Sequence, residues 1–234
     1  MIRKYKILTL ILFVVTLISC RKSDIIVDKE YLITDDGNGV NVTKWTKDKS
    51  YILDGFVFVN PGQTLTIEAG TVIRAKTGQG ENASALIIAR GGKIIAEGTK
   101  DEPIIFTVEG DDLKGSVPVE ARGLWGGIII LGNAQLNSEF NESRIEGIPL
   151  TEPRGIYGGS VNNDNSGILK YVSIRHGGTN IGEGNEINGL TLGGVGSGTT
   201  IEYVEVVSNQ DDGFEFFGGT VNCRYLVAAL CGDD

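Results

Sequence analysis

The sequence predicts an all-β protein, a right-handed parallel β-helix in which short strands wind into stacked coils. Two observations lead to this prediction: short apolar runs separated by turn residues, and strand-like segments that repeat along the chain. The chain has 234 residues, of which 34 are glycine and only 5 are proline. This glycine share is about twice the usual roughly 7%. Frequent tight corners account for it, because glycine accepts backbone angles that other residues resist.

Runs of β-branched and aromatic residues recur from Trp45 onward, and glycine, asparagine or aspartate separates them. Such runs are typical of short strands. No amphipathic stretch of helical period and useful length follows residue 20, which argues against an α-helical body. The clearest runs lie at residues 56–59, 65–67, 71–73, 86–88, 104–107, 128–131, 171–174 and 203–206.

Three segments in the second half of the chain align with one another. Each has a tyrosine at its fourth position, and Tyr171, Tyr203 and Tyr225 are separated by steps of 32 and 22 residues. Segments 188–194 and 212–219 also align with each other. A repeat of this length with two or three strands predicts a solenoid, whereas a propeller blade needs roughly 40 residues and four strands. An immunoglobulin-type sandwich would not repeat its own strands.

Stacked coils place equivalent side chains in columns at the ordinary strand spacing of about 4.8 Å. We expect Ile174, Val206 and Ala228 to form one inner column, and glycine, asparagine and aspartate to form the corners. A body of residues 45–234 with 22 to 32 residues a coil predicts roughly seven coils. The last strand-like run stops just before Asp234 without a cap. We therefore expect a truncated solenoid with further coils beyond residue 234, or a partner chain that covers this end.

The first residues have the pattern of a signal peptide at 1–19. Three basic residues precede an apolar run of about twelve residues, which is shorter than the ~20 that span a bilayer. The run ends Leu17-Ile18-Ser19-Cys20, which resembles a bacterial lipobox. The resemblance implies cleavage before Cys20, diacylation of its sulfur and a stable membrane anchor. An ordinary secretory peptide with a chance cysteine is the alternative.

The charge of the chain excludes some partners. The formal net charge is −9, and removal of the basic leader leaves −12 on the remainder. A body this acidic repels nucleic acid and anionic membrane surfaces, so a hard cation such as Ca²⁺ is a more natural partner. One histidine and three cysteines exclude most structural zinc sites. Residues 20–44 are polar and predict a flexible tether ahead of a β-helix domain at 45–234.

Several motifs of the body occur together. They are Trp45 with Tyr51-Ile52-Leu53-Asp54-Gly55, the segments 65–73, 84–94 and 103–107, Gly123-Leu124-Trp125-Gly126-Gly127, and Asp211-Asp212-Gly213-Phe214-Glu215. With these motifs the chain resembles a family of bacterial surface or secreted lipoproteins, predicted right-handed β-helices that are distantly similar to pectate-lyase-like folds. The resemblance covers residues 45–234. It implies an outer-membrane lipoprotein of a Gram-negative-type bacterium, periplasmic or surface-exposed. It implies no particular activity, since fold alone does not supply chemistry.

Two aspartate pairs are the strongest candidates for a site. Asp211-Asp212 and Asp233-Asp234 lie 22 residues apart, so stacking is expected to place Asp211 over Asp233 and Asp212 over Asp234. Such pairs can hold Ca²⁺, act as the acid and base of glycoside cleavage, or form corners through Asx-turns. Segment 209–212 also resembles the Asp-Asp motif of polygalacturonase-type β-helices. Those enzymes add a Gly-His-Gly motif on a following coil, whereas the only histidine here, His176, lies on an earlier coil.

Two arginines are the candidate bases of a pectate-lyase-like mechanism, in which calcium acidifies the α-proton of a uronate. Arg175 and Arg224 lie nearest the predicted aspartate stack. Ion pairs at the strand ends are the alternative, and such pairs are individually worth little.

Aromatic residues could line a sugar platform. Trp125, Tyr157 and Phe217 are the candidates, although Trp125 could instead cover the core, and Phe214 and Phe216 are expected inside. Cys223 and Cys231 flank a strand that would hold them ~25 Å apart if extended, so small buried thiols are expected, unless a bend brings them into disulfide reach.

The sequence therefore predicts a lipid-anchored envelope protein that binds polysaccharide, or another cell-surface partner, without cleaving it. The long stacked faces of a solenoid suit extended ligands. The alternatives are a polysaccharide lyase or glycoside hydrolase acting on acidic glycans, and a purely structural spacer.

Overall fold

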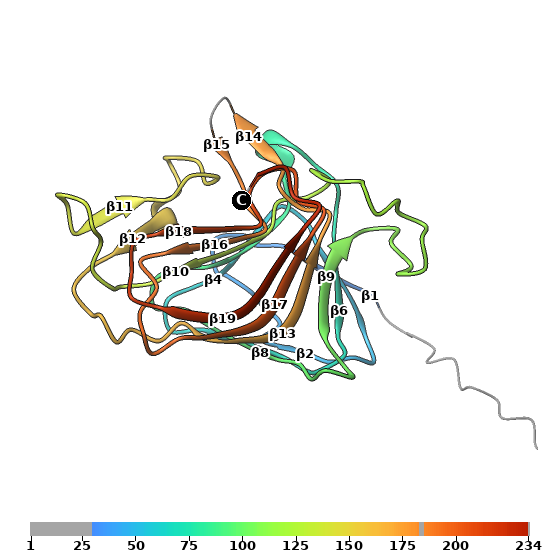
Figure 1. Cartoon of the computed structure of the whole chain (residues 1–234), viewed down its shortest axis with the longest axis horizontal. Coiled ribbons are helices and arrows are strands. Elements are labelled where there is room, and N and C mark those ends of the chain that lie inside the picture. The colour runs from blue at the N-terminus through green and yellow to red at the C-terminus, as the bar shows by residue number, and fades with distance from the viewer. Residues whose placement is uncertain (1–29, 183–184, 234) are drawn as a thin grey trace, which may run out of the picture.

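The computed structural model describes residues 30–182 and 185–233 of the chain, and these form a parallel β-helix (Figure 1). The predicted signal peptide, Cys20 and Asp234 lie outside the described residues. Strands of successive coils pair in parallel around one apolar interior. The predicted all-β solenoid is confirmed.

Three faces surround the interior. The first face contains β2 (Lys44–Trp45), β5 (Thr64–Ile67) and β8 (Lys93–Glu97). The second face contains β1 (Glu30–Ile33), β3 (Ser50–Leu53), β6 (Val72–Ala75) and β9 (Ile104–Val108). The third face contains β4 (Phe56–Val59), β7 (Ala85–Ile88), β10 (Ile128–Leu131), β16 (Leu190–Gly193) and β18 (Phe214–Phe217).

Three long strands cross from the first face to the second. They are β13 (Gly167–Arg175), β17 (Thr200–Val207) and β19 (Asn222–Ala229), which lie side by side in Figure 1. Residues 167–170 of β13 pair with β8, whereas residues 172–174 pair with β9. The unpaired residue between them, Tyr171, therefore marks the corner between the two faces.

The register confirms the repeat that the sequence predicts. Ile174 pairs with Val206 and Val206 with Ala228, so the expected column exists; Ile174 and Val206 are buried, whereas Ala228 on the last strand is exposed. On the third face Leu190 pairs with Phe214, its counterpart in the aligned segment that follows. Aligned sequence segments thus occupy equivalent positions in neighbouring coils.

Two sequence expectations about the extent of the coils are wrong. The described residues complete five coils before β19, not seven, because segments 109–127 and 132–166 leave the solenoid between strands. The tether was also predicted to extend to residue 44, but β1 already pairs in parallel with β3. This first strand is formed by Glu30–Ile33, in which Ile33 is buried.

The corners carry unexpected residues. Tyr171, Tyr203 and Tyr225 have positive φ angles of 49°, 55° and 57°. A second corner repeats the same steps at His176, Ser208 and Leu230, with φ of 62°, 59° and 58°. Bulky residues in this region cost free energy. The tyrosines offset it by stacking, with ring centroids 4.5 and 4.4 Å apart and interplanar angles of 7° and 14°.

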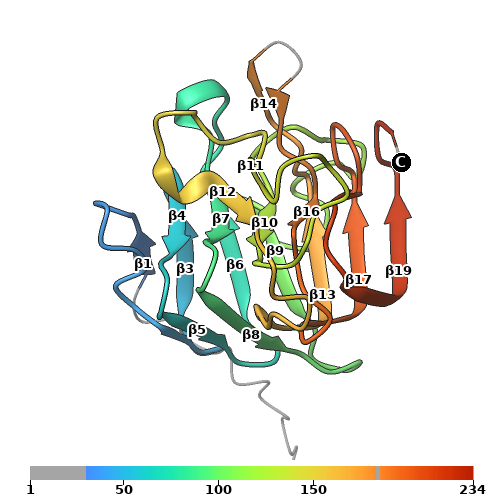
Figure 2. The same cartoon turned by 90° about the vertical axis from the view of Figure 1, so that its left-hand side faces the viewer.

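An insertion covers the outer side of the third face (Figure 2). Residues 132–166 contain β11 (Glu142–Arg144), the 3₁₀ turn η2 (Pro153–Gly155) and β12 (Ile156–Gly158). A second hydrophobic cluster joins outward residues of the face, such as Ile87 and Ile129, to Ile145, Ile148 and Tyr157 of the insertion. The third face is therefore buried on both sides at β7 and β10.

One ion pair fastens the insertion to the first coils. Arg154 of the insertion lies 2.6 Å from the carboxylate of Asp35, whose side chain is 1% exposed. The same carboxylate accepts hydrogen bonds from the backbone N–H groups of Gly37, Gly39 and Phe58. The Arg154 guanidinium also lies 3.8 Å from the centre of the Phe58 ring.

Two shorter excursions rise beside the corners. The hairpin of β14 (Asn180–Gly182) and β15 (Asn185–Glu186) lies between β13 and β16, and the 3₁₀ turn η1 (Gly80–Asn82) lies between β6 and β7. Backbone contact between coils is close at Gly167, where an added Cβ would lie 1.8 Å from the Ile94 carbonyl oxygen.

Candidate functional site

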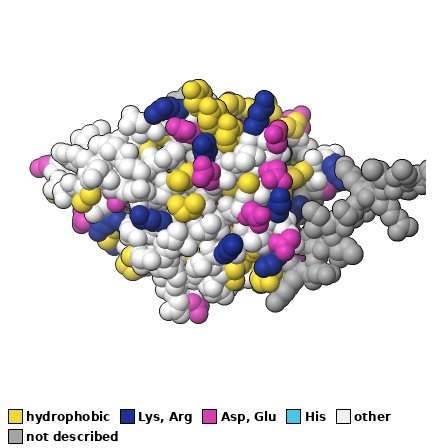
Figure 3. Space-filling model, turned by 90° about the horizontal axis from the view of Figure 1, so that it is seen from below, with side chains coloured by type: hydrophobic (Ala, Val, Ile, Leu, Met, Phe, Trp, Pro, Cys, Tyr) yellow, Lys and Arg dark blue, Asp and Glu magenta, His cyan; other side chains and the backbone are white. Residues whose placement is uncertain are grey.

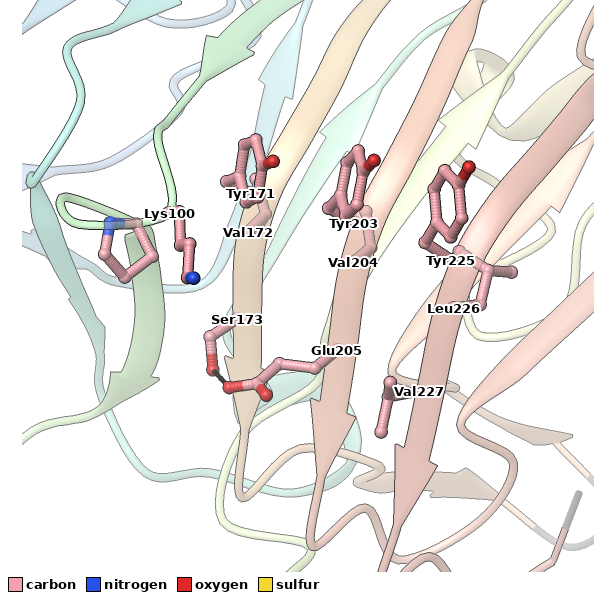
Figure 4. A pocket seen from close by; sticks show the side chains of 11 residues that line it. Lys100, Tyr171, Val172, Ser173, Tyr203, Val204, Glu205, Tyr225, Leu226 and Val227 are labelled. Atoms are coloured by element: carbon pink, nitrogen blue, oxygen red, sulfur yellow. Dashed lines mark hydrogen bonds between the residues drawn. The ribbon is translucent and has the colours of Figure 1, made fainter.

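A groove of about 500 Å³ runs across three coils on the outside of the corner between the first and second faces (Figure 4). Its walls come from the turn before β9 and from β13, β17 and β19. They are Lys100, Pro103, Tyr171, Val172, Ser173, Tyr203, Val204, Glu205, Tyr225, Leu226 and Val227. We call it the tyrosine groove.

The tyrosine groove has two banks. Tyr171, Tyr203 and Tyr225 form one bank, and Ser173, Glu205 and Val227, two residues later on each strand, form the other (Figure 4). The residues between them turn toward the core. Because equivalent positions repeat from coil to coil, a linear molecule lying along the solenoid axis meets a tyrosine at each of these three coils, whereas the side chain on the opposite bank changes.

The tyrosine bank becomes more exposed toward β19. Tyr203 is 37% and Tyr225 is 63% exposed. Loss of hydration and the neighbouring tyrosines raise the pKa of Tyr203, so its hydroxyl stays protonated and can donate. Tyrosine combines apolar ring area with a polar hydroxyl, which suits a wet binding surface.

The opposite bank contains a fixed carboxylate. Ser173 Oγ donates to Glu205 Oε1 at 2.6 Å, and Arg175 Nε donates to Ser173 Oγ at 2.8 Å. Arg175 Nη2 lies 3.5 Å from the same Glu205 oxygen. These contacts hold the Glu205 side chain in one place.

A second candidate site gathers acidic residues near the corner that follows β17. Burial and the charge of Asp233 raise the pKa of Asp211. The backbone N–H of Gly232 donates to the Asn209 carbonyl at 3.0 Å, which continues the coil-to-coil register of β17 and β19 and fits the predicted stacking of Asp211 on Asp233. Burial raises the pKa of Glu186 on the hairpin, and so do the negative charges of Asp211 and Glu146.

The neighbouring pair Glu146 and Glu215 shares hydrogen bonds. Burial and the Glu146 carboxyl raise the pKa of Glu215 to about 8. The Asn188 amide donates to Glu146 Oε1 at 3.3 Å and also to Glu215 Oε2. Asn188 is 1% exposed and accepts from the Asp212 N–H at 3.2 Å. A carboxyl group that keeps its proton can donate to a second carboxylate, which explains how the two acids lie together.

A polar pocket of about 400 Å³ opens between this acidic region and the hairpin. Its lining residues are Gln79, Arg122, Gly123, Asn180, Glu186, Gln210 and Asp211. Within the described residues, no group of three or more histidine, cysteine, aspartate or glutamate side chains is arranged to hold a metal ion.

The predicted bases do not join the aspartates. Arg175 lies on the second face with Ser173 and Glu205, and Arg224 lies 3.8 Å from Glu202 on the first face. Their positions match the ion-pair alternative. His176 sits at a positive-φ corner, where its Nδ1 contacts the Ala121 carbonyl oxygen at 2.6 Å.

The predicted sugar platform is buried. Trp125 is 0% exposed and donates from its indole nitrogen to the Arg175 carbonyl at 2.7 Å. Tyr157 is 7% exposed, and its ring packs edge-on against Phe217 beneath the insertion. Trp125 therefore has no ring face available to a ligand, and the Tyr157 and Phe217 pair is largely covered. Phe214 packs against the interior core, as expected, whereas Phe216 is 50% exposed.

The two cysteines near the end of the chain are free thiols, as expected. Burial raises the pKa of the Cys223 thiol to about 11.

Comparison with known proteins places the fold in a family. A family model described as "Pectate-lyase like beta helix domain" matches residues 37–234. The chain belongs to this family. The match begins shortly after β1 and includes every complete coil of this pectate-lyase-like β-helix. No curated protein and no solved structure matches the chain. Among the described residues, no helix is long and apolar enough to cross a membrane.

Sequence reasoning missed the tyrosine groove and found only the Asp211 and Asp233 part of the acidic site, for different reasons. The repeating tyrosines were visible, but they only marked the register. The positive-φ corner that turns them outward had no glycine signal. Glu146, Glu186 and Arg122 come from segments outside the repeat, so no spacing rule brings them to Asp211.

Proposed function

We propose that this chain is the body of a lipid-anchored cell-envelope protein that binds polysaccharide without cleaving it. The tyrosine groove is the observation that carries the proposal. Three stacked tyrosines and a fixed carboxylate line an open track across three coils. Binding sites combine apolar and aromatic surface with a few placed polar groups, and solenoids offer them along an extended surface.

The lipid anchor is the part of this proposal that depends on sequence alone. Cys20 follows a lipobox-like segment, and the anchor would hold the protein in the outer membrane of a Gram-negative-type bacterium. Cells producing the protein should incorporate labelled palmitate into it, and Cys20→Ser should abolish the label. Unchanged labelling of Cys20→Ser would remove the anchor from the proposal.

Affinity electrophoresis tests the binding function. The full chain carrying Cys20→Ser is run through gels that contain single polysaccharides, with calcium and with chelator. We expect at least one polymer to retard the protein without being consumed. Calcium dependence would connect binding to Asp211 and Asp233, the predicted cation site. No retardation by any polymer would contradict the proposal and favour a structural spacer.

Substitution of a residue that lines the tyrosine groove tests whether the polymer binds there. Tyr203→Asn removes the central ring but keeps a residue that tolerates positive φ, and we expect retardation to fall at least about fivefold, a loss typical of one aromatic contact. The matched control is Phe140→Ala, which removes a 71% exposed aromatic ring from the insertion. Equal effects of the two variants would place the polymer elsewhere.

Cleavage of acidic glycans is the second candidate function, and the polar pocket favours it. Glu186 and Asp211 both have raised pKa values and face the same pocket as Arg122. A general acid needs a pKa near the working pH. If polymer is lost behind the migrating band and Asp211→Asn prevents this loss, the protein cleaves the polymer and the non-catalytic proposal is contradicted.

A further inference from the structure

We propose that the tyrosine groove selects neutral glycans rich in hydroxyl groups, and that Glu205 is the residue that sets this selectivity. The proposal rests on the polysaccharide-binding function proposed above and names the class of polymer. It is independent of Asp211 and the polar pocket.

Glu205 presents one oxygen to the groove in a fixed orientation. Both of its protein contacts, from Ser173 Oγ and Arg175 Nη2, meet Oε1. The other oxygen, Oε2, has no hydrogen-bond partner within the described part of the chain. The side chain is 42% exposed and lies on the bank opposite the tyrosines (Figure 4).

A carboxylate oxygen in this position distinguishes between polymers by charge. It accepts hydrogen bonds only, so it suits a sugar hydroxyl that donates. Hydrogen bonds to a charged acceptor are stronger than neutral ones. A uronate carboxylate at the same place would meet a like charge, which is unfavourable. A tyrosine hydroxyl can either donate a hydrogen bond to a sugar hydroxyl or accept one from it.

Few unpaired cations lie near the groove to offset the repulsion between Glu205 and an anionic polymer. Arg175 already donates to Ser173 and lies beside Glu205. Among the described residues that line the groove, Lys100 is the one cation, and it forms no ion pair with another described residue. On the adjoining first face Lys170 pairs with Glu97 and Arg224 with Glu202. Acidic and basic side chains are interspersed on the side of the molecule shown in Figure 3. The mature chain as a whole has a charge of −12, which repels polyanions at a distance.

Affinity electrophoresis with two classes of polymer tests the selectivity. The neutral probes are dextran, galactomannan and a β-glucan, and the anionic probes are polygalacturonate and alginate, each at low and at moderate salt. For the Cys20→Ser chain we expect retardation by a neutral polymer and none by the polyanions. Glu205→Gln should weaken neutral binding at least about fivefold, because a charged acceptor is lost. It should also allow measurable retardation by a polyanion at moderate salt.

The matched control is Glu202→Gln. It makes the same change in charge on the same strand, but Glu202 does not line the groove. Circular dichroism and the melting temperature check that both variants fold. If Glu202→Gln changes binding as much as Glu205→Gln does, net charge and not the groove sets selectivity, and the inference is wrong.

The remaining outcomes separate this inference from the proposed function. If Tyr203→Asn abolishes binding but the parent chain binds polyanions as strongly as neutral polymers, the function stands and the inference fails. If no polymer retards the parent chain, both fail. If neutral binding depends on both Tyr203 and Glu205, both are supported.

Discussion

The tyrosine groove and the acidic region near the hairpin are assembled in opposite ways. In the groove, neighbouring coils supply the same positions, and Tyr171, Tyr203 and Tyr225 stack on one another. In the acidic region, the insertion supplies Glu146, the hairpin supplies Glu186, and the corner after β17 supplies Asp211. One surface repeats a contact, whereas the other brings together residues from unrelated segments.

This difference teaches where the molecule is vulnerable. A repeated contact is distributed, so the loss of one ring leaves the backbone pairing of the coils in place. The insertion is held by an apolar cluster and by the buried Arg154 and Asp35 pair, and breaking that pair leaves an uncompensated charge. Substitutions in the insertion should therefore have larger effects than comparable substitutions in the repeat.

The largest expected effect is that of Arg154→Met. The substitution keeps apolar volume over Phe58 but removes the cation beside the buried Asp35 carboxylate. Breaking a buried ion pair costs about 3–5 kcal/mol. We expect the lower end, about 3 kcal/mol, because three backbone N–H groups still bond to Asp35. Urea unfolding measures the change in the free energy of unfolding.

A surface ion pair provides the control for Arg154→Met. Lys76 lies 2.8 Å from Asp54, and both side chains are more than one third exposed. Lys76→Met should change the free energy of unfolding little, since exposed pairs contribute little. Similar losses for the two variants would contradict the view that burial makes the Arg154 contact important.

A smaller effect is expected within the repeat. Tyr203→Asn removes two ring pairs, and Tyr225→Asn removes one, while asparagine tolerates the positive φ at both corners. We expect Tyr203→Asn to destabilise about twice as much as Tyr225→Asn, and both less than Arg154→Met. Thermal unfolding measures all three. A larger loss for Tyr225→Asn would show that stacking does not stabilise this corner.

The same contrast explains what the sequence could predict. The steps between Tyr171, Tyr203 and Tyr225 fixed the register of three coils, and the structure confirms it. The corner type was not predictable from residue preference, because a tyrosine at positive φ is favoured only once its neighbours stack on it. The sequence left Trp125 open between a sugar platform and a cover for the core, and the closed coil shows that it is buried.

The acidic region was beyond sequence reasoning for a further reason. The stacking step predicts Asp211 above Asp233, and the charge of Asp233 contributes to the raised pKa of Asp211. No pattern connects either residue with Glu146, which lies in the insertion, several strands before Asp211 in the chain. Contacts of an insertion depend on where it packs, and this is decided by apolar residues such as Ile145 and Ile148 that carry no periodic signal.

The dependence of stability on pH sharpens the comparison further. Glu215 has a pKa of about 8 in the folded protein, well above its ordinary value of 4.5. The folded state therefore holds more protons than the unfolded chain between these two values, and stability should decline as the pH rises through this window. Glu186 and Asp211, whose pKa values are also raised, act in the same direction.

Glu215→Gln isolates the contribution of this carboxyl group. Glutamine can accept from Asn188 and donate to Glu146 at any pH, so the stability of the variant should decline less between pH 5 and pH 8 than that of the parent chain. Urea unfolding at several pH values gives both slopes, and Glu202→Gln on the first face is the matched control. Tyr203→Asn removes no carboxyl group from the acidic region, so this groove variant should keep the parental slope. A parental slope in Glu215→Gln would mean that the proton is not held between Glu146 and Glu215, and the acidic region would then be an ordinary hydrated surface.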